Sequence, residues 1–190
     1  MAKMTTGPIW PVMHLPTLLV GANVDGKPNF LAVGACSIAN DVPPMVTIAI
    51  RPERYSHRGI VENGTFSVNV PSVDQVREVD FCGIESGAKV DKVAACGFDV
   101  FYGKLGTAPL IEQCPVGFEC SVVQTVELDT HSLFIGRIDE GHISEDCLTD
   151  GNPDVRKVRP IVYTRNPVQQ YEALGEVIGK AYSVGLELRR

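Results

Sequence analysis

The sequence contains no pair of cysteines in the CxxC arrangement that many zinc sites use. Its cysteines are spread along the chain instead, at Cys36, Cys82, Cys96, Cys114, Cys120 and Cys147. In a cytosolic chain such cysteines are expected to stay reduced. Cys120 lies in an alternating apolar run, so we interpret it as a small buried hydrophobic residue. No metal site is predicted.

Nucleotide-binding signatures and membrane-spanning runs are also missing. Neither GxGxxG nor GxxxxGK[ST] occurs, so the phosphate loops of Rossmann and P-loop proteins have no support. No apolar run approaches the ~20 residues that a membrane helix needs. The N-terminal residues, interrupted by Pro8, Pro11 and Pro16, lack a signal-peptide pattern. We therefore expect a cytoplasmic protein with no membrane association.

Positive charge is scarce in this chain. It has 17 Lys and Arg against 23 Asp and Glu, a formal net charge of −6, and no dense basic stretch. Nucleic-acid binding is therefore not predicted. A chain of 190 residues, 44% hydrophobic, is long enough for a single domain with its own core. We expect that domain to cover residues 1–190, with irregular segments at 1–14 and 175–190.

Apolar runs rich in Val and Ile, bounded by Gly, Pro, Asn and Asp, predict β-strands. They lie at residues 17–24, 30–36, 45–50, 66–70, 117–126, 131–138, 159–163 and 169–174. Asp25-Gly26 between the first two runs predicts a hairpin, since Gly accepts positive φ. Most of the strands are joined by turns of hairpin length. The pattern predicts a mainly β fold with peripheral helices, built as an antiparallel barrel.

Short helices are predicted in the middle of the chain. Ser56 has the character of an N-cap for a helix through residue 63, which Gly64 would end. Ser72 and Gln75 have the spacing of a capping box, and a helix is expected from there to about residue 82. Residues 83–97 are less regular, with a short helix from residue 91, and are the longest candidate for a flap over a ligand.

The turn after the predicted strand 45–50 carries the most informative chemistry. It contains Arg51, Arg54, Tyr55, Ser56, His57 and Arg58 and leads into a predicted helix. Free N–H groups at a helix N-terminus, together with basic and hydroxyl side chains, form an anion site. A sheet that can hold a flat ring beside such a site suggests a nucleotide-like cofactor. A simple helix cap and a solvated basic face are the structural alternatives.

The order of these segments resembles a known family. The segments DGKPNF, PPMVTIAIRPERYSHRGIVENGTFSVNVP, SGAKVDK, ECSVVQTVELDTHSLFIGRI and RPIVYTRNPVQQYEALGE are similar to the flavoredoxin branch of the flavin-reductase-like proteins. The resemblance spans about residues 15–185 and implies a Greek-key, FMN-binding split barrel that forms a homodimer. It also implies a non-covalent FMN near the dimer interface. NADH, NADPH or a redox partner protein would reduce that flavin.

The resemblance also implies roles for particular residues. It places Arg51, Tyr55 and Ser56 at the phosphate end, with Lys92 of segment 83–97 as a second phosphate or ring contact. The other implied contacts lie along the ring and ribityl chain: Asn29, Ala35, Cys36, Ser37, His131 and Thr164.

His131 is the one candidate catalytic residue. The resemblance places it near the redox-active part of the flavin, and histidine can change charge near neutral pH. A structural histidine that bonds the turn backbone is the alternative, as an exposed helix-start lysine is for Lys92. Ala35 and Thr164 stand where related chains often carry aromatic residues, so the ring packing departs from the family pattern there.

Three functions are compatible with the sequence. The first is an FMN-dependent enzyme that oxidises NADH or NADPH and passes electrons to an acceptor. The second is an electron carrier whose bound FMN is reduced by a partner protein. The third is a split-barrel protein that binds haem or a deazaflavin instead. The visible spectrum of the purified protein separates the third from the other two.

Overall fold

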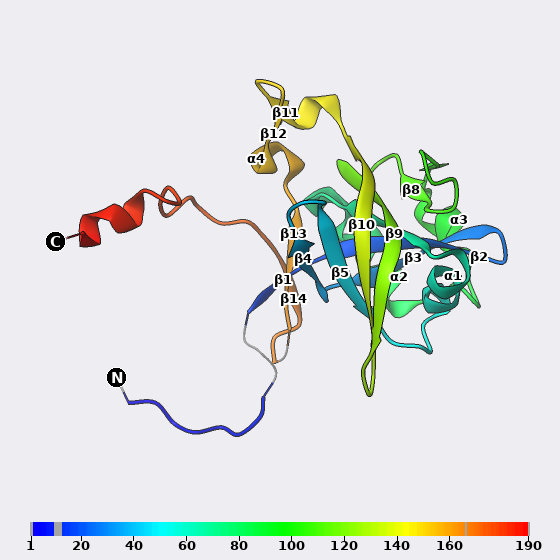
Figure 1. Ribbon diagram of the computed structural model, residues 1–190, viewed down its shortest axis with the longest axis horizontal. Coiled ribbons are helices and arrows are strands. Elements are labelled where there is room, and N and C mark those ends of the chain that lie inside the picture. Colours follow the sequence, from blue (N-terminus) through cyan, green and yellow to red (C-terminus); the bar gives the residue numbers. More distant parts are fainter. Residues whose placement is uncertain (1, 10–12, 166, 190) are drawn as a thin grey trace.

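The structure, a computed structural model that describes residues 2–9, 13–165 and 167–189, is dominated by one seven-stranded sheet. Its strand order is β3-β2-β6-β9-β10-β5-β4, and its pairings are antiparallel. The strands are β2 (Leu18–Val24), β3 (Lys27–Val33), β4 (Cys36–Asn40), β5 (Met45–Ile50), β6 (Thr65–Val70), β9 (Val116–Glu127) and β10 (Ser132–Ile143). The sheet curls on itself (Figure 1), so the predicted split-barrel fold is confirmed.

Smaller elements surround this sheet. A second, three-stranded sheet has the order β1-β13-β14, with strands His14–Pro16, Ile161–Thr164 and Gln170–Ala173. Two ribbons pair β7 (Val100–Phe101) with β8 (Leu110–Ile111) and β11 (Leu148–Thr149) with β12 (Asn152–Pro153). The helices are α1 (Tyr55–Asn63), α2 (Val76–Ile84), α3 (Lys92–Cys96) and α4 (Val155–Val158), with 3-10 turns at Val73–Gln75, Glu145–Cys147 and Val184–Leu188. Figure 1 shows α1, α2 and α3 at the periphery of the barrel.

Strand β2 is buried on both faces, and each face contributes to a different core. Its even-numbered residues, Leu18, Val20 and Ala22, point into the barrel together with Ile48 and Phe66 from other strands. Leu19 points to the opposite face and joins a second cluster with residues of α2 and the segments beside it. Successive side chains of a strand alternate between faces, which explains this division. The helices are therefore fixed against the barrel by apolar packing.

Several local predictions are confirmed. Asp25 and Gly26 have φ of 51° and 75° and connect β2 to β3, as a hairpin turn requires. Gly64 follows α1 with φ of 64° in the left-handed region. Ser72 and Gln75 form both hydrogen bonds of a capping box.

Two local predictions are wrong. Ser56 does not cap α1, because the N-cap residue is Arg54 and Ser56 lies buried within the first turn. The expected strand 30–36 is broken: β3 ends at Val33 and β4 begins at Cys36. The break has a structural reason, since β3 pairs with β2 whereas β4 pairs with β5. Gly34 and Ala35 carry the chain from one neighbour to the other.

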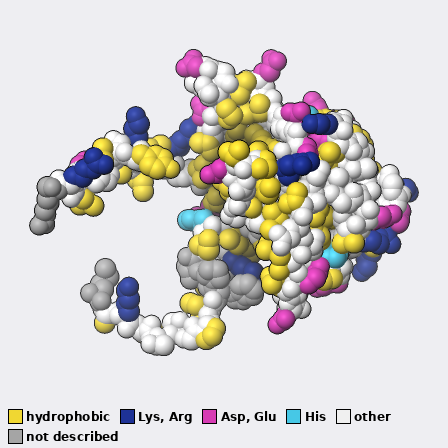
Figure 2. All heavy atoms as spheres, in the orientation of Figure 1, with side chains coloured by type: hydrophobic (Ala, Val, Ile, Leu, Met, Phe, Trp, Pro, Cys, Tyr) yellow, Lys and Arg dark blue, Asp and Glu magenta, His cyan; other side chains and the backbone are white. Residues whose placement is uncertain are grey.

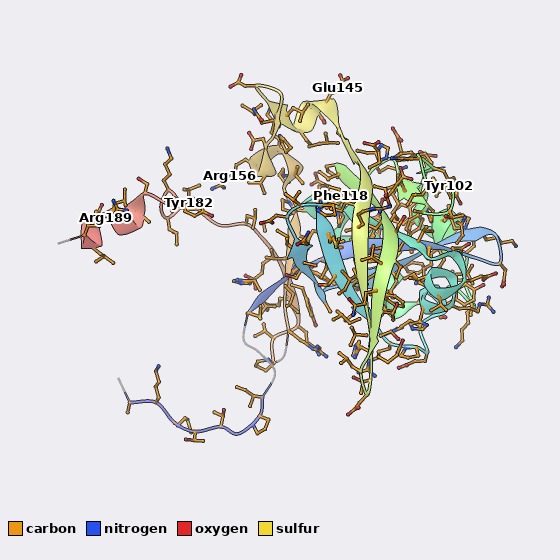
Figure 3. All side chains as sticks on the ribbon, viewed as in Figure 1. Tyr102, Phe118, Glu145, Arg156, Tyr182 and Arg189 are labelled. Carbon is orange, nitrogen blue, oxygen red and sulfur yellow. The ribbon has the colours of Figure 1, made fainter. Side chains whose placement is uncertain are left out.

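Both ends of the chain lead away from the sheets. The C-terminal tail, residues 174–189, extends outward after β14, and Figure 3 shows Tyr182 and Arg189 on it, far from the barrel. Its apolar side chains are largely exposed, with Ile178 at 100% and Tyr182 at 102%, and Figure 2 shows apolar atoms along it. Positions 1, 10–12 and 190, which belong to the expected end segments, lie outside the described residues. None of the helices in the described ranges is long and apolar enough to cross a membrane.

Candidate functional site

Two adjoining cavities lie beside β3, the end of β5 and the start of α1. The large cavity has a volume of about 580 Å³ and the small cavity about 190 Å³. Leu31, Arg51 and Arg54 line both cavities, so the two form one continuous cleft. Their volumes together are in the range of small-molecule and cofactor sites.

The small cavity contains the N-terminus of α1. The N-cap residue Arg54 makes no side-chain capping bond at the start of this nine-residue helix. The N–H of His57 donates to Arg54 O at 2.9 Å, so the N–H groups of Tyr55 and Ser56 are the ones that a ligand can reach.

Ser56 is 1% exposed, and its hydroxyl accepts a hydrogen bond from Asn29 Nδ2 at 2.6 Å. This leaves the Ser56 hydroxyl proton free to donate. The wall of the small cavity also contains the carboxylates of Glu53 and Glu85. The Ser56 hydroxyl, the cations beside it and the start of the helix are the groups of this cavity that suit an anion.

Two arginines stand where the cavities meet. Arg51 makes a long, exposed ion pair with Glu53, 3.5 Å between Nη1 and Oε1. Exposed pairs of this kind contribute little, so Arg51 can exchange this partner for another anion. Within residues 2–9, 13–165 and 167–189, Arg54 makes no ion pair. Arg54 is therefore the cation most available to a bound anion.

Lys92 lies in the wall of the small cavity as a buried residue, 3% exposed. Its ammonium group donates to the carbonyl oxygens of Phe30 at 2.9 Å and Cys82 at 2.8 Å. These bonds join β3 to the end of α2 and leave one N–H of the ammonium. Burial lowers the pKa of Lys92. The lysine thus fastens the 85–91 loop to the barrel and adds a charge beside the small cavity.

The approach of the 85–91 loop to the barrel depends on Gly87. A Cβ atom at this position would lie 1.9 Å from Asn29 Oδ1 and 2.9 Å from Tyr55 Cδ1. Asn29 is buried and held by Ser56, so it has little room to yield. Only a glycine lets the loop close over Asn29 and Tyr55, and the small cavity takes its shape from that closure.

The walls of the large cavity are apolar in one part and polar in another. Leu31, Ala35 and Ala49 belong to these walls, and His131 lines the same cavity. His131 Nδ1 lies 2.8 Å from the hydroxyl of Thr130, so the bond that the histidine makes is to its neighbour in the turn. A flat, largely apolar ring with a few polar edges matches such a cavity.

Thr17 lines the large cavity and has an unsatisfied hydroxyl. The residue is 4% exposed, and its Oγ1 atom has no hydrogen-bond partner within the described part of the chain. Buried hydroxyl groups in native proteins almost always have a partner. The Thr17 hydroxyl can therefore form a hydrogen bond with a water molecule or with a polar atom of a ligand in the cavity.

Tyr171 and Asp80 form a hydrogen-bonded pair at the side of the large cavity. The Tyr171 hydroxyl donates to Asp80 Oδ1 at 2.9 Å, and the Tyr171 ring packs against Tyr163 with centroids 5.5 Å apart. Burial, and secondarily the Asp80 carboxylate, raises the pKa of Tyr171 strongly. The phenol therefore stays protonated at physiological pH and links β14 to α2.

The structure brings most of the sequence-predicted residues together. Asn29, Arg51, Tyr55, Ser56 and Lys92 line the small cavity, and Ala35 and His131, with Arg51 again, line the large one.

Three predicted residues lie elsewhere. Cys36 packs against the barrel core, and burial raises its pKa to about 11. Ser37 is exposed on β4, and its hydroxyl contacts Ile38 O at 3.4 Å. The Thr164 hydroxyl donates to Glu172 at 2.5 Å. These three residues line neither cavity.

Sequence reasoning missed several cavity residues. Thr17, Asp80, Tyr163 and Arg165 all line the large cavity. Tyr163 and Arg165 flank the predicted residue Thr164, so their place in that segment was a signal for them. Thr17 and Asp80 come from distant segments, so only the fold brings them to this cavity. Gly87 could be suspected from the sequence, because it lies in segment 83–97, which is predicted to be a flap over a ligand.

Comparisons with known proteins agree with this geometry. Residues 12–172 match the family described as flavin reductase like domain, so the chain belongs to the flavin-reductase-like family. It is similar to the flavoredoxin of Methanosarcina acetivorans, with 39% identity, a TM-score of 0.94, and coverage of 99% of this chain and 100% of that one. The flavoredoxin of Desulfovibrio vulgaris (Miyazaki F) is 34% identical, with a TM-score of 0.88 and coverage of 97% and 100%.

A relative from Archaeoglobus fulgidus is 34% identical over 142 residues, which cover 74% of this chain and 78% of that protein. The sequence resemblance to the flavoredoxin branch is therefore confirmed.

Proposed function

We propose that the protein is an FMN-binding oxidoreductase that moves reducing equivalents from NADH, NADPH or a redox partner through FMN to an acceptor. One observation carries this proposal: a cleft that joins the large cavity, here called the ring compartment, to the small cavity at the start of α1, here called the anion compartment. FMN has the same two parts, a flat ring system and a phosphate. When bound, the flavin supplies the hydride and electron chemistry.

The residues of this chain hold and orient the cofactor in this proposal. Arg54, the Ser56 hydroxyl and the first N–H groups of α1 would hold the phosphate. Leu31 and Ala49 would flank the ring and exclude water from it. His131, in the wall of the ring compartment, is the candidate side chain for contact with the redox-active part of the ring.

The test begins with the visible spectrum of the purified protein. Flavin bands that disappear on anaerobic addition of NADH or NADPH support the enzyme, whereas a Soret band identifies haem instead. Binding of FMN and of riboflavin is then compared by quenching of flavin fluorescence. Tighter binding of FMN is expected, because riboflavin has no phosphate. Equal affinity for the two would overturn the phosphate assignment.

A second candidate function rests on the charge around the cleft. The wall of the large cavity carries three arginines, Arg51, Arg54 and Arg165, and one acidic residue, Asp80. The cavity is therefore positively charged, whereas the whole chain has a net charge of −6. A positive rim suits an acidic electron-transfer protein as well as a nucleotide. For a carrier, we expect a reduced acidic partner such as a ferredoxin to reduce the flavin, and the pyridine nucleotides to leave it oxidised.

The proposal includes a homodimer, because the exposed apolar tail is difficult to explain in a lone chain. The tail contains four large apolar side chains that are each at least 74% exposed: Val177, Ile178, Tyr182 and Leu188. Exposed apolar surface of this kind marks an interaction site. In analytical ultracentrifugation the full-length protein should sediment as a dimer, and a chain that ends after Leu174 should sediment as a monomer. A full-length protein that sediments as a monomer would contradict the proposal.

A cytoplasmic location is also proposed. It is supported by the six cysteines, none of which forms a disulfide.

A further inference from the structure

His57, in the first turn of α1, lies on the face of the helix that packs against the barrel. The centre of its ring is 5.3 Å from that of Phe134, which is 1% exposed in the barrel core. Ile60, three residues further along α1, belongs to the same core. Residues three apart share one face of a helix. His57 is therefore the polar end of the face that fixes α1 to the barrel.

Two hydrogen bonds in series join His57 to the hairpin of β9 and β10. His57 Nε2 lies 2.8 Å from Ser132 Oγ, and Ser132 Oγ donates to Glu127 Oε2 at 2.7 Å. A serine hydroxyl has one hydrogen, and Glu127 receives it. The bond between His57 and Ser132 therefore needs a hydrogen on Nε2, so His57 is the donor at the start of the chain.

Serine, histidine and a carboxylate also form the catalytic sites of many hydrolases, but the order of the bonds here is different. In a nucleophilic site the serine hydroxyl gives its proton to the histidine. Ser132 gives its proton to Glu127 instead, and the residue is 0% exposed, so it has no surface that a substrate could reach. The chain of hydrogen bonds is therefore a connection between elements.

On the sheet, this connection ends beside residues of both cavities. Ser132, the first residue of β10, pairs with Ile50, the last residue of β5. Arg51, directly after Ile50, lines both cavities. His131, directly before Ser132, lines the large cavity. The hydrogen-bond chain is thus anchored where the walls of the two cavities come together.

On α1, the connection acts on the start of the helix. Tyr55 and Ser56, the two residues before His57, line the small cavity, and their N–H groups are the ones that a ligand can reach. Ser56 is bonded to Asn29 of β3, and His57 is bonded to Ser132 of β10. Two adjacent residues thus hold the first turn of α1 on two different strands.

We propose that His57 is the positioning residue of the anion compartment. Its hydrogen bond to Ser132 holds the first turn of α1 in the orientation that binds the phosphate of FMN. The described residues that line the two cavities do not include His57, so it acts through the helix. Groups that are fixed in advance lose little freedom when a ligand binds. This inference rests on the proposed function, since it takes the phosphate to bind at the start of α1.

The experiment compares the affinities of FMN and riboflavin for the full-length protein by quenching of flavin fluorescence. The test variant His57→Leu keeps an apolar side chain against Phe134 and removes the donor. We expect it to bind FMN about fivefold more weakly and riboflavin within about twofold of the wild type, because riboflavin has no phosphate. His57→Gln supplies an amide N–H in place of the ring N–H, and should restore FMN affinity to within about twofold.

The control for a loss of packing is Ile60→Val, on the same face of the same helix. Ile60 is 0% exposed, so this substitution should lower the midpoint of thermal unfolding by about 2–4 °C. The ratio of its FMN and riboflavin affinities should stay that of the wild type, because the hydrogen-bond chain is intact.

Ser132→Ala tests the same bond from its other end. It removes the acceptor of His57 and should weaken FMN binding as much as His57→Leu does. The double variant His57→Leu with Ser132→Ala should bind FMN no more weakly than either single variant, because both substitutions remove the same interaction.

The possible outcomes separate this inference from the proposed function. A wild-type protein that binds no flavin, or binds FMN no more tightly than riboflavin, overturns the phosphate assignment and this inference with it. Preference of the wild type for FMN, with His57→Leu and Ser132→Ala both at wild-type affinity, overturns the inference alone. So does an equal loss of FMN and riboflavin affinity in these two variants.

Two further results would also contradict the positioning role. One is His57→Gln as weak for FMN as His57→Leu, since the donor would then not matter. The other is Ile60→Val with the same selective loss of FMN, since any loosening of α1 would then have that effect. If His57→Leu does not fold, Ser132→Ala decides the question, because it leaves every residue of α1 in place.

Discussion

The two compartments of the cleft are built in opposite ways. In the small cavity the buried polar groups are already held: Asn29 donates to Ser56, and Lys92 donates to two backbone carbonyls. In the large cavity a buried hydroxyl, that of Thr17, has no partner in the described ranges. The small cavity is organised before a ligand arrives, whereas the large one is completed by its ligand.

This difference has an energetic consequence. Groups that are fixed in advance lose little conformational freedom when a ligand binds, so more of their interaction energy appears as affinity. We therefore expect the anion compartment to dominate the affinity for FMN. Changes to the ring compartment should reduce the affinity for FMN less. Some of them should raise the stability of the protein while they lower its affinity for FMN.

The largest loss of FMN affinity is expected from Gly87→Ala, because this substitution changes the shape of the small cavity directly. The added Cβ must displace Asn29 or Tyr55, since it would lie 1.9 Å from Asn29 Oδ1. Overpacking of this kind costs about 1–3 kcal/mol, and the distorted cavity should bind FMN about a hundredfold more weakly. Fluorescence titration and thermal unfolding measure the two effects.

Gly83→Ala is the matched control for this change. Gly83 lies within α2 and also lines the large cavity, but a Cβ there would meet only Ala32 Cβ at an ordinary 3.4 Å. Since alanine favours helix over glycine, the control should raise stability by about 0.5–1 kcal/mol and retain FMN. If both variants bound FMN like the wild type, the loop would not shape the anion compartment.

Arg54→Ala should have the next largest effect, and it should depend on the phosphate. A hydrogen bond to a charged group contributes about 1.5–3 kcal/mol, so FMN affinity should fall about tenfold to a hundredfold. Riboflavin affinity should not change. Arg58→Ala is the control, because Arg58 pairs with Asp25 and lines neither compartment. A parallel loss of FMN and riboflavin affinity would place Arg54 at the ring instead.

The sequence predicts the barrel strands well because they are apolar runs rich in Val and Ile. β6 also alternates visibly, with Phe66 and Val68 in the barrel core and Ser67 and Asn69 on the other face. The break between β3 and β4 escaped prediction for a physical reason. Residues 30–36 form one continuous apolar run, and only the pairing of β4 with β5 divides it.

The site is predictable only where its residues are neighbours in sequence. Arg51, Tyr55 and Ser56 lie in one turn, so their chemistry can be inferred together. Thr17 and Tyr171 reach the large cavity from opposite ends of the chain, through the three-stranded sheet and the segment beside it. The role of Ser56 as a partner of Asn29, rather than as a helix cap, also depends on this long-range packing.

Ser56→Ala should have a moderate effect on both stability and affinity. It removes the acceptor of the buried Asn29 amide, at a cost of about 1–3 kcal/mol to folding. It also removes one donor from the anion compartment, so FMN should bind about fivefold more weakly. Ser37→Ala should change neither quantity, because Ser37 is exposed and lies outside both cavities. An effect of Ser37→Ala on FMN binding, with none of Ser56→Ala, would place the flavin against β4 instead of the start of α1.

The smallest effect, and the most diagnostic for the ring compartment, is expected from Thr17→Val. Valine has the shape of threonine but no hydroxyl, so the substitution removes a buried polar atom that has no partner among the residues that the structure describes. The flavin-free protein should therefore become more stable, by about 1 kcal/mol. If a polar atom of the flavin satisfies this hydroxyl, FMN and riboflavin should both bind about threefold more weakly.

A substitution that raises the stability of the flavin-free protein and lowers its affinity for flavin identifies a group whose hydrogen-bond partner is the ligand. A group that already has a partner within the protein should not show both effects. Thr65→Val provides the contrast, because the Thr65 hydroxyl already pairs with that of Thr107 at 2.8 Å. This variant should lose stability and keep its affinity for FMN. Thermal unfolding without flavin and fluorescence titration with it measure both quantities on both variants. If Thr17→Val destabilised the flavin-free protein, its hydroxyl would have a partner there, and the two compartments would not differ in the way proposed.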